Sequence, residues 1–540
     1  MSDQSQATET KGFLGWVEKT GNKLPDPVFI FFYLIIALMI ISVITSALGA
    51  NAVLGEQVLS GMAESQKQRF SIGEDGLIPA ISLLSPDNIQ RLWVEMPETF
   101  THFHPLGYVL VVMLGAGVAE RSGLFAAGMR SAVRGAPKFL LTPVVALVAM
   151  VGNHAADAAY VVLIPLAGIL FASAGRHPIA GITAAFAGVS GGFSANLFPG
   201  QLDALLYGIT EAAGEILVPD YDANIAGNWW FIAAILFIYL PIIWLVTDRV
   251  IEPKLGAYEP SGTAANSFNE DDKPLEPEQV KGLKWAGLAC LGTIALWAFM
   301  TWGPGTPLIS EAPEGETVEW YIEYSPFFNS LVAFFLVIFL AAGWAYGAAA
   351  NTINNHKDLV EMMAEAMKDM GYYLVLAFAA AHFVAMFSWS NLGLISAVHG
   401  ADAIESSGLP LPILLGLIVL FSASINLFVG SASAKWALLA PVMVPMLMLL
   451  GVSPDGATAV YRVGDAATNI ITPLMVYFPL ILVFAQRWQK DFGLGSLMAM
   501  MIPYSVWMLI SGVLLVVLWV WLGWDLGPGA PMRFELPSAG

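Results

Sequence analysis

The sequence predicts an all-α polytopic membrane protein with nine transmembrane helices and two re-entrant helical hairpins. Three observations support this: a composition of 57% hydrophobic and 12% charged residues, eleven long apolar runs in 540 residues, and Lys and Arg that favour alternate loops. Soluble domains carry about 25% charged residues. The net charge of −19 argues against nucleic acid as a partner, because phosphate binding requires cationic surfaces.

Most apolar runs fit one helix each, since a span needs about 20 residues. The first run, 28–48, is too long for a signal-peptide core and is expected to be a retained span. Two runs, 139–172 and 411–450, are too long for a single helix. The runs, in chain order, are 28–48, 105–124, 139–172, 182–210, 229–247, 283–302, 327–349, 371–394, 411–450, 460–486 and 497–523.

Loop charges give the expected topology, because Lys and Arg concentrate on the cytoplasmic side. The loop 303–326 contains five glutamates and no Lys or Arg, and is expected outside. The cationic residues that mark the N-terminus and four loops as cytoplasmic are Lys11, Lys19, Lys23, Arg121, Arg130, Arg134, Arg249, Lys254, Lys357, Lys368, Arg487 and Lys490.

Each long run has flanks of like charge, which favours a hairpin that enters and leaves on the same side of the membrane. Run 139–172 has cationic residues on both flanks, so it is expected to enter and leave on the cytoplasmic side. Run 411–450 has acidic flanks and is expected to enter and leave from outside. Two hairpins from opposite faces are typical of an inverted-repeat secondary transporter. The alternative, two full spans in each run, stays open.

The expected organisation has two membrane halves without a soluble domain. Segment 355–370 is expected to form an amphipathic surface helix, and the loop 50–104 a small extracytoplasmic cap. The parts are a cytoplasmic tail 1–27, a first half 28–248 with hairpin 139–172, a cytoplasmic connector 249–282, a second half 283–523 with hairpin 411–450, and a tail 524–540.

The strongest functional signal is Asn426-Leu-Phe-Val-Gly-Ser-Ala-Ser-Ala-Lys-Trp436, followed by Arg462-Val-Gly-Asp465. A charge at membrane depth costs about 2.5–3.5 kcal/mol even on lenient scales. The Gly and Ser residues weaken a continuous helix. Broken backbone is tolerated at membrane depth only where it is buried or lines a cavity. The combination predicts a transport site.

Similar local patterns occur in both halves. Asn153-x3-Asp157 in the first half and Asp465-x3-Asn469 in the second each place an acid and an amide on one helical face, with a proline (Pro165 or Pro473) eight residues after the aspartate. Ser194-Ala-Asn196-Leu-Phe-Pro-Gly200 likewise resembles Ser424-Ile-Asn426-Leu-Phe-Val-Gly430. The order of the two patterns is exchanged between the halves, so they do not align as a simple duplication.

These patterns supply the oxygen ligands that a hard cation such as Na⁺ prefers. Asn426, Asp465 and carbonyl groups near Gly430 can hold the ion if the second hairpin tip meets the helix around Asp465. A related site in the first half would use Asn153, Asp157 and Asn196. The alternative is that these amides only form hydrogen bonds with the unpaired backbone groups at interrupted helix ends.

Several side chains suit an aromatic, anionic solute. The guanidinium of Arg462 matches a carboxylate in bidentate geometry, or else it forms an ion pair with Asp465. Trp436 offers a stacking face, Asp203 is a candidate proton or substrate partner, and Lys435 is expected to snorkel to the interface. No nucleotide-binding loop or nucleophile–base set appears, so we expect a carrier driven by an ion gradient rather than an enzyme.

At these residues the chain resembles the AbgT family, the p-aminobenzoyl-glutamate transporters, along nearly its whole length. The resemblance implies a homodimer in a bacterial inner membrane, with nine spans and two hairpins in each subunit. The stretches that carry it are Val17-Glu-Lys-Thr-Gly-Asn-Lys-Leu-Pro25, Gly117-Val-Ala-Glu-Arg-Ser-Gly123, Asp157-Ala-Ala-Tyr-Val-Val-Leu-Ile-Pro165, Ser433-Ala-Lys-Trp436 and Arg462-Val-Gly-Asp465.

The resemblance also implies an ion-coupled carrier of p-aminobenzoyl-glutamate or, as in some relatives, an exporter of sulfonamide antimetabolites. It implies a Na⁺ site at Asn426 and Asp465 with Ser433 close by. The substrate-path positions that it implies are Asp203, Trp436, Pro454, Arg462 and Pro473. Two alternatives stay open: a Na⁺-coupled dicarboxylate or short-chain acid carrier, and a gated ion channel. H⁺ coupling is equally open.

Overall fold

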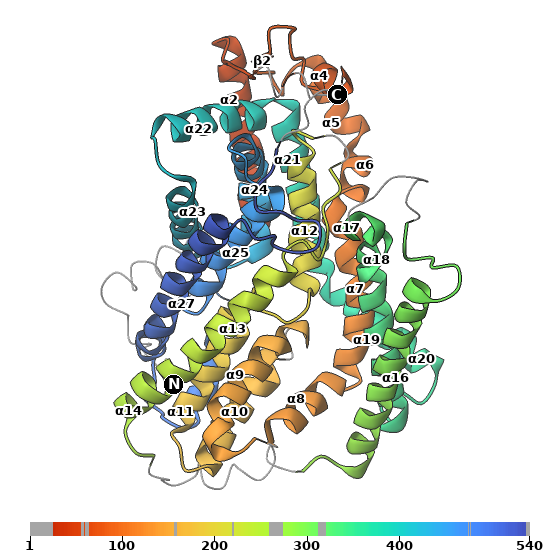
Figure 1. Cartoon of the computed structure of the whole chain (residues 1–540), viewed down its shortest axis with the longest axis vertical. Helices are drawn as coiled ribbons and strands as arrows, with labels where there is room; N and C mark the ends of the chain where they lie inside the picture. The colour runs from red at the N-terminus through yellow and green to blue at the C-terminus, as the bar shows by residue number, and fades with distance from the viewer. Residues whose placement is uncertain are drawn as a thin grey trace, which may run out of the picture.

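The computed structural model describes residues 25–55, 59, 64–134, 136–155, 159–218, 221–258, 274–310, 320–472, 475 and 477–535. These residues are mostly helical, and their one sheet pairs β1 (Asn51–Val53) with β2 (Leu77–Pro79) in antiparallel register (Figure 1). The expected helical class is thus confirmed. The expected site residues Asp157 and Pro473, the tail 1–24 and the middle of the connector, 259–273, lie outside the described residues.

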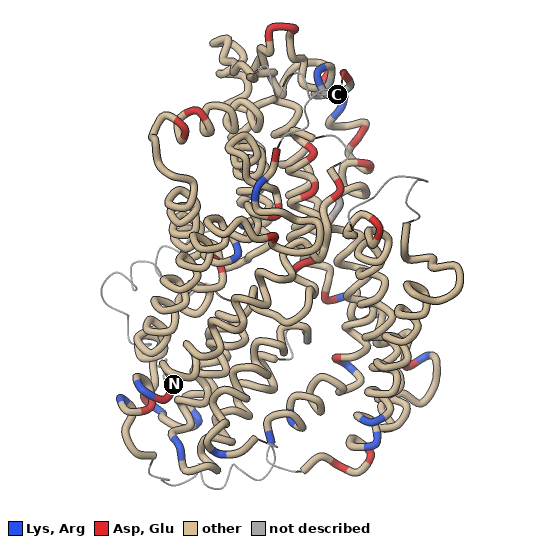
Figure 2. The backbone as a smooth tube through the Cα atoms, in the orientation of Figure 1, with Lys and Arg blue, Asp and Glu red and all other residues tan. Residues whose placement is uncertain are grey.

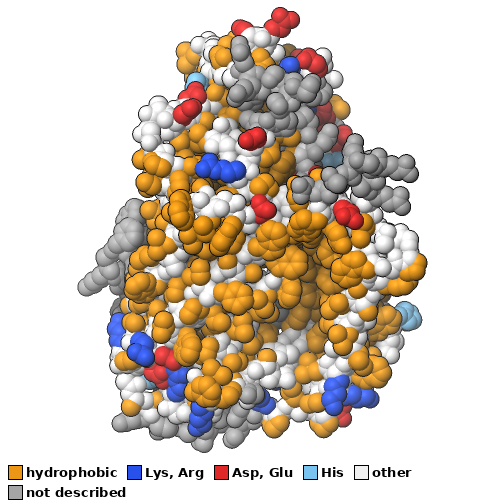
Figure 3. Space-filling model, in the orientation of Figure 1, with side chains coloured by type: hydrophobic (Ala, Val, Ile, Leu, Met, Phe, Trp, Pro, Cys, Tyr) orange, Lys and Arg blue, Asp and Glu red, His pale blue; other side chains and the backbone are white. Residues whose placement is uncertain are grey.

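Seven of the described helices are long and apolar enough to cross a bilayer. All but α24 bury one face and leave large hydrophobic side chains exposed on the other, as α2 does with Phe31 buried and Phe29 exposed. Figure 3 shows the result as a broad apolar belt between two charged ends. The seven are α2 (Pro27–Ala47), α13 with α14 (Trp229–Leu255), α16 (Pro277–Trp302), α19 (Leu331–Ala349), α21 (Gly371–Trp389), α24 (Ala432–Leu449) and α27 (Leu494–Leu522).

An eighth candidate span is bent. Helices α7 (His104–Arg121) and α8 (Leu124–Arg134) meet at 63° across a short break. Gly123 occupies that break at φ +89°, a conformation that glycine adopts without strain. Helix α7 packs against α19, which packs against α16. A Cβ at Gly343 of α19 would lie 2.7 Å from the Ala119 backbone nitrogen, so glycine permits this close helix crossing.

Both over-long apolar runs are divided in the structure. The first consists of α9 (Leu141–Val151) and α10 (Ile164–Ser173), and the second of α23 (Leu411–Asn426) and α24. A π-helical turn over Ala159–Leu163 leads into α10, whose first turn contains Pro165. Three of these four helices are too short to cross a bilayer alone, whereas α24 reaches the required length.

Two further elements are interrupted near the centre of the molecule. Helix α11 (Pro178–Phe186) continues as a π-helical turn to Gly191 and then gives way to irregular chain before α12 (Gln201–Gly214). In the second half, α25 (Pro454–Asn469) ends well before α26 (Phe478–Gln486). Every residue of α25 is buried, including its charged ones. These interruptions bring backbone and polar side chains together inside the apolar belt.

A small cap covers one end of the molecule. Asn391 anchors it, because its amide donates to the carbonyl groups of Phe70 at 2.6 Å and Pro79 at 2.9 Å. The helix expected at 355–370 is present as α20, with Asn355 as its N-cap. The remaining helices are α4 (Glu64–Arg69), α5 (Pro86–Val94), α6 (Met96–Thr101), α17 (Trp320–Glu323), α18 (Ser325–Asn329), α20 (His356–Asp369) and α22 (Leu392–Ser406).

Charges are segregated between the two ends. Figure 2 shows most Lys and Arg at the end that carries α8 and α14, and most Asp and Glu toward the end that carries α22 and α5. At the basic end, Arg176 donates to Asp248 at 2.6 Å and also pairs with Glu252, which fixes the loop after α10 onto α14. This distribution fits the positive-inside rule with the basic end in the cytoplasm.

Candidate functional site

A cavity of about 280 Å³ lies where the interrupted elements meet. Its wall is formed by the break after α9, the N-terminal end of α12, the break between α23 and α24, and residues that follow α25. The lining residues are Asn153, His154, Tyr160, Phe193, Asn196, Gly200, Gln201, Leu202, Asp203, Leu205, Gly430, Ser431, Ala432, Ser433, Asn469, Met475 and Tyr477.

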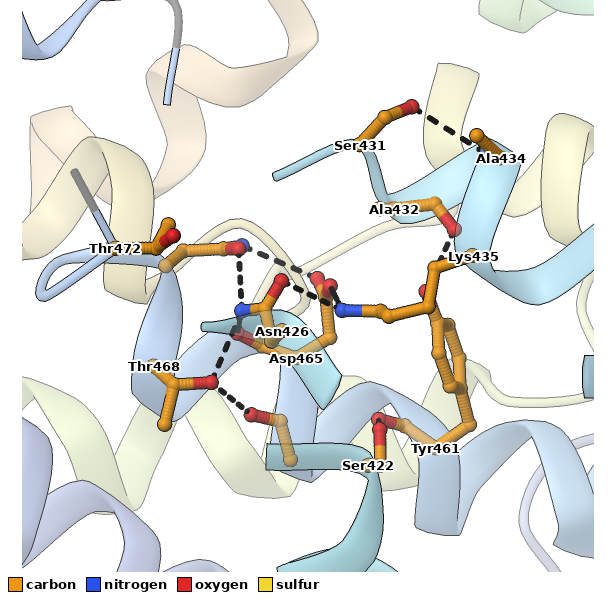
Figure 4. Close-up of polar contacts among 12 residues, drawn as sticks. Ser422, Asn426, Ser431, Ala432, Ala434, Lys435, Tyr461, Asp465, Thr468 and Thr472 are labelled. Atoms are coloured by element: carbon orange, nitrogen blue, oxygen red, sulfur yellow. Dashed lines mark hydrogen bonds and ion pairs between the residues drawn. The ribbon is translucent and has the colours of Figure 1, made fainter. Parts of the chain in front are cut away.

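Behind this wall lies a fully buried ion pair (Figure 4). The Nζ atom of Lys435 is 2.5 Å from Oδ1 of Asp465 and 2.6 Å from Oδ1 of Asn426. The side chains of Lys435 and Asp465 are 0% and 1% exposed. The expectation that Lys435 snorkels to the interface is therefore wrong. The helix that carries it begins at Ala432, after a break inside the protein, so its first turn lies in the interior.

Asn426 and Asn469 complete the polar cluster. The amide nitrogen of Asn426 lies 2.8 Å from the Asp465 carbonyl oxygen, 2.9 Å from Thr468 Oγ1 and 2.8 Å from Asn469 Oδ1. Asn469 in turn donates to the second carboxylate oxygen of Asp465 at 3.1 Å. The predicted i,i+4 pairing of acid and amide is thus present. Both carboxylate oxygens are bonded, as a buried charge requires.

Two aromatic rings support the ammonium group. The Lys435 Nζ atom lies 5.3 Å from the ring centroid of Tyr461, within the range of a cation–π contact. Trp436 stacks on the same ring at 4.5 Å between centroids and donates its indole N–H to Thr210 at 3.0 Å. Trp436 is completely buried and lies behind the cavity wall rather than in it.

A second buried ion pair connects the two halves of the chain. Arg462 donates to Oδ1 of Asp203 at 2.6 Å, and the two side chains are 2% and 5% exposed. The other oxygen of Asp203 accepts the backbone N–H of Gly200 at 2.7 Å, which caps α12. Arg462 therefore pairs with an aspartate of the first half and not with Asp465, although Asp465 is its neighbour one turn along the same helix.

Two amide oxygens of the cavity wall have no hydrogen-bond partner among the residues that the structure describes. They belong to Asn153 and Asn196, whose side chains are buried. The amide nitrogen of Asn153 donates to the carbonyl groups of Met150 and Gly192 at 3.0 and 3.1 Å, which fixes its orientation. Buried acceptors without partners are costly, so these oxygens are suited to a ligand that donates a hydrogen bond or to a cation.

The structure thus brings six of the expected site residues to the cavity: Asn153, Asn196, Asp203, Gly430, Ser433 and Asn469. Four others, Asn426, Trp436, Arg462 and Asp465, form the layer directly behind it. Pro454 occupies the first turn of α25, next to its N-cap Ser453. Sequence reasoning missed Tyr160 and Tyr477, which stack at 4.3 Å between centroids on the wall, because no local pattern relates residues so far apart.

The side chains that could bind a coupling cation have suitable oxygen atoms, but some of these oxygens already bond another group of the protein. Among the described residues, no group of three or more His, Cys, Asp or Glu gathers as for a transition metal. Asn426 and Asp465 offer the amide and carboxylate oxygens that suit Na⁺, yet both oxygens bond the ammonium group of Lys435. A cation therefore fits there only when that ammonium group moves away.

Interrupted helices that meet at a buried, charged cavity within an apolar belt define the class of multi-pass membrane transporters. The chain belongs to the family described as the "AbgT putative transporter family", whose model matches residues 12–534.

Known proteins of this family match the chain over almost its full length. The chain is 35% identical over 538 residues to the p-aminobenzoyl-glutamate transport protein of Escherichia coli K12, covering 99% of this chain and 100% of that protein. The Neisseria gonorrhoeae MtrF structure matches with 41% identity and a TM-score of 0.86, covering 96% of this chain and all of that one. The Alcanivorax borkumensis YdaH transporter matches with 39% identity and a TM-score of 0.83, covering 93% and 100%.

Proposed function

We propose that this protein is an ion-coupled secondary transporter of p-aminobenzoyl-glutamate, of sulfonamide-type antimetabolites, or of both. The observation that carries the proposal is the cavity at the junction of four interrupted elements, with one buried ion pair of the second half behind its wall and another that joins the two halves at the wall. The Escherichia coli relative is named for p-aminobenzoyl-glutamate transport, and MtrF is described among antimetabolite efflux pumps.

The lining suits an aromatic amide that ends in carboxylates. Tyr160 and Tyr477 offer stacked aromatic surface, and the hydroxyl groups of Ser431 and Ser433 offer hydrogen bonds. Arg462 lies behind Asp203, and its Nε–H group has no partner in the described part of the chain. A substrate carboxylate that competes with Asp203 for Arg462 would gain a charge-assisted hydrogen bond. Sulfonamides share the aminophenyl ring but have no such carboxylates, so Arg462 should contribute less to their transport.

We propose Na⁺ as the coupling ion, with H⁺ as the alternative. The buried ammonium group of Lys435 supports a site for one positive charge at Asn426 and Asp465. Carbonyl oxygens near Gly430 would complete the ligands. The unpartnered oxygens of Asn153 and Asn196 favour a second, related position on the opposite wall.

We also propose the finer topology of nine spans and two re-entrant hairpins, in a homodimer in the bacterial inner membrane. The short helices α9, α10 and α23 support the hairpins, because none is long enough to cross a bilayer. The segregated charges support cytoplasmic and external ends. Native mass spectrometry of detergent-solubilised protein tests the dimer, and a monomeric mass would refute it.

The test is uptake of labelled p-aminobenzoyl-glutamate into proteoliposomes, with and without a Na⁺ gradient. We expect saturable uptake that is driven by Na⁺ and competed by a sulfonamide, and that Asp465→Ala loses. Lys368→Met, which changes an exposed lysine, is the control. Uptake that follows a proton gradient alone would refute Na⁺ coupling. Competition by plain dicarboxylates, without an effect of aromatic ligands, would favour an acid carrier.

A further inference from the structure

Three cavities follow one another along α12. The central cavity includes Leu205 and Ser433, and both also line a second, much smaller cavity. That small cavity includes Phe103, which also lines a third cavity of about 390 Å³. From Leu205 to Glu215, α12 rises about 15 Å at 1.5 Å per residue. The three cavities therefore form one series from the site to the C-terminal end of α12.

The small cavity is an apolar constriction. Its volume of about 20 Å³ holds about one water molecule, so the series is closed there in this conformation. Its lining includes four small side chains on α21 and α24, namely Ala377, Ala380, Ala434 and Ala437, each at most 5% exposed, beside larger ones such as Phe103 and Tyr373. Small side chains leave room that a modest separation of α21 from α24 would open. Apolar constrictions of this kind close pores by excluding water.

The third cavity is an acidic vestibule. Arg91 faces Glu95, Glu98 and Glu215, so one positive against three negative charges gives a formal charge of −2 with His102 neutral. The guanidinium of Arg91 lies 4.7 Å from the ring centroid of Trp389 and pairs with Glu95 at 2.8 Å. The residues lie on α5, α6, α12 and α21 at the acidic end of the molecule (Figures 1 and 2).

Two unpartnered hydroxyl groups along the series point to a solute rather than to simple packing. Ser388 is 7% exposed and lines the vestibule, and its hydroxyl has no hydrogen-bond partner within the described ranges of the chain. The hydroxyl of Tyr373, in the constriction, also has none. A buried hydroxyl without a partner costs about 1–3 kcal/mol, and a polar solute that passes would remove that cost.

We infer that this series is the path of the aromatic solute between the central cavity and the acidic, external face, and that Phe103 with the alanine wall is its gate. The inference rests on the proposed transport function. The alanine wall determines the width of the path and therefore the largest aromatic group that passes. The negative vestibule raises the free energy of an anion there during passage in either direction, so it selects against solutes with excess negative charge.

The test uses single cysteines in a Cys290→Ala background, which removes the one native cysteine. Ala380→Cys lies on the path, whereas the adjacent Ala379→Cys is buried but lines none of the three cavities. A membrane-impermeant thiol reagent is added from the external side of proteoliposomes under an imposed Na⁺ gradient. We expect Ala380→Cys to react at least tenfold faster than Ala379→Cys. Equal reactivity, or none at either position, would refute the path.

A second variant distinguishes failure of the proposed path from failure of the proposed function. Ala380→Phe fills the constriction, and we expect transport of p-aminobenzoyl-glutamate to fall at least tenfold while its Kd at the central cavity changes less than twofold. Val375→Phe, on an exposed face of the same helix, is the matched control. Normal transport by Ala380→Phe would refute the gate. If the unmodified protein transports no such solute, the proposed function fails, but the difference in cysteine labelling still tests the path.

Discussion

The buried pair of Lys435 and Asp465 gives the sharpest prediction. Lys435→Met removes the ammonium group and retains most of the apolar stem, leaving the carboxylate of Asp465 buried without its cation. Removing one partner of a buried pair costs about 3–5 kcal/mol. Both side chains are at most 1% exposed, so we expect a loss within that range. Asp465→Asn should cost a similar amount.

The double variant Lys435→Met/Asp465→Asn decides whether the charges depend on each other. Because neither charge is then left uncompensated, we expect its stability to lie near that of one single variant rather than at the sum of both losses. Thermal unfolding in detergent, followed by size-exclusion chromatography of the heated samples, ranks the four proteins. Lys368→Met, on an exposed helical face, should behave as the unmodified protein. Losses that simply add would refute the coupling.

The same variants test the competition with Na⁺. If the ammonium group holds the place of a coupling cation, Lys435→Met leaves Asn426 and Asp465 open to Na⁺. Ligand at 100 times its Kd stabilises a protein by about 2.7 kcal/mol, so added NaCl should raise the melting temperature of this variant more than that of the unmodified protein. Choline chloride controls for ionic strength. Equal effects of both salts on both proteins would refute the shared site.

Three further predictions concern packing and the basic end. Arg176→Gln should lower stability by about 1–3 kcal/mol because it breaks partly buried charged hydrogen bonds to Asp248 and Glu252. Lys368→Gln, in an ion pair with Glu365 at 70% and 43% exposure, should leave stability nearly unchanged, and thermal melts compare the two. Burial lowers the pKa of His177, whose Nδ1 accepts the N–H of Ile179 at 3.2 Å. Its neutral form is therefore favoured in the fold, and stability should fall as the pH drops below about 6.5 toward the lowered value, a dependence that His177→Asn should weaken. Gly343→Ala should destabilise by about 1–3 kcal/mol, since its Cβ would lie 2.7 Å from Ala119. Gly287→Ala, with open space around it, should be neutral or stabilising.

The lengths of the apolar runs, and the residues that interrupt them, predicted most helices because a helix must match the thickness of the bilayer that it crosses. Glycine, serine and proline predicted the interruptions before α12 and α24, since these residues weaken helices wherever they occur. These patterns did not predict which charged side chains form ion pairs with each other. Arg462 and Asp465 are helix neighbours at i,i+3, so a local argument pairs them first. The fold instead gives Arg462 a partner 259 residues away and Asp465 a partner 30 residues away.

The position of Lys435 shows the same limit. A lysine near the end of an apolar run usually reaches the interface, and that assumption holds only if the helix end is at the membrane surface. Here α24 begins at an internal break, so the lysine of its first turn meets the carboxylate of α25. The Asn426 motif nine residues earlier indicated an interior break, which is inconsistent with a lysine that reaches the membrane surface.

Helix α25 connects the two predicted binding functions. Arg462 bonds Asp203 on α12 and Asp465 bonds Lys435 on α24, one helical turn apart. A solute that competes for Arg462 and a cation that displaces Lys435 would both release α25 from a neighbour, so each should favour binding of the other. Binding linkage is reciprocal and typically amounts to about 1–3 kcal/mol. Titrations of p-aminobenzoyl-glutamate at fixed Na⁺, and of Na⁺ at fixed solute, should therefore give the same ratio of affinities. Asp203→Asn should reduce that ratio, and an unchanged ratio in this variant would refute coupling through α25.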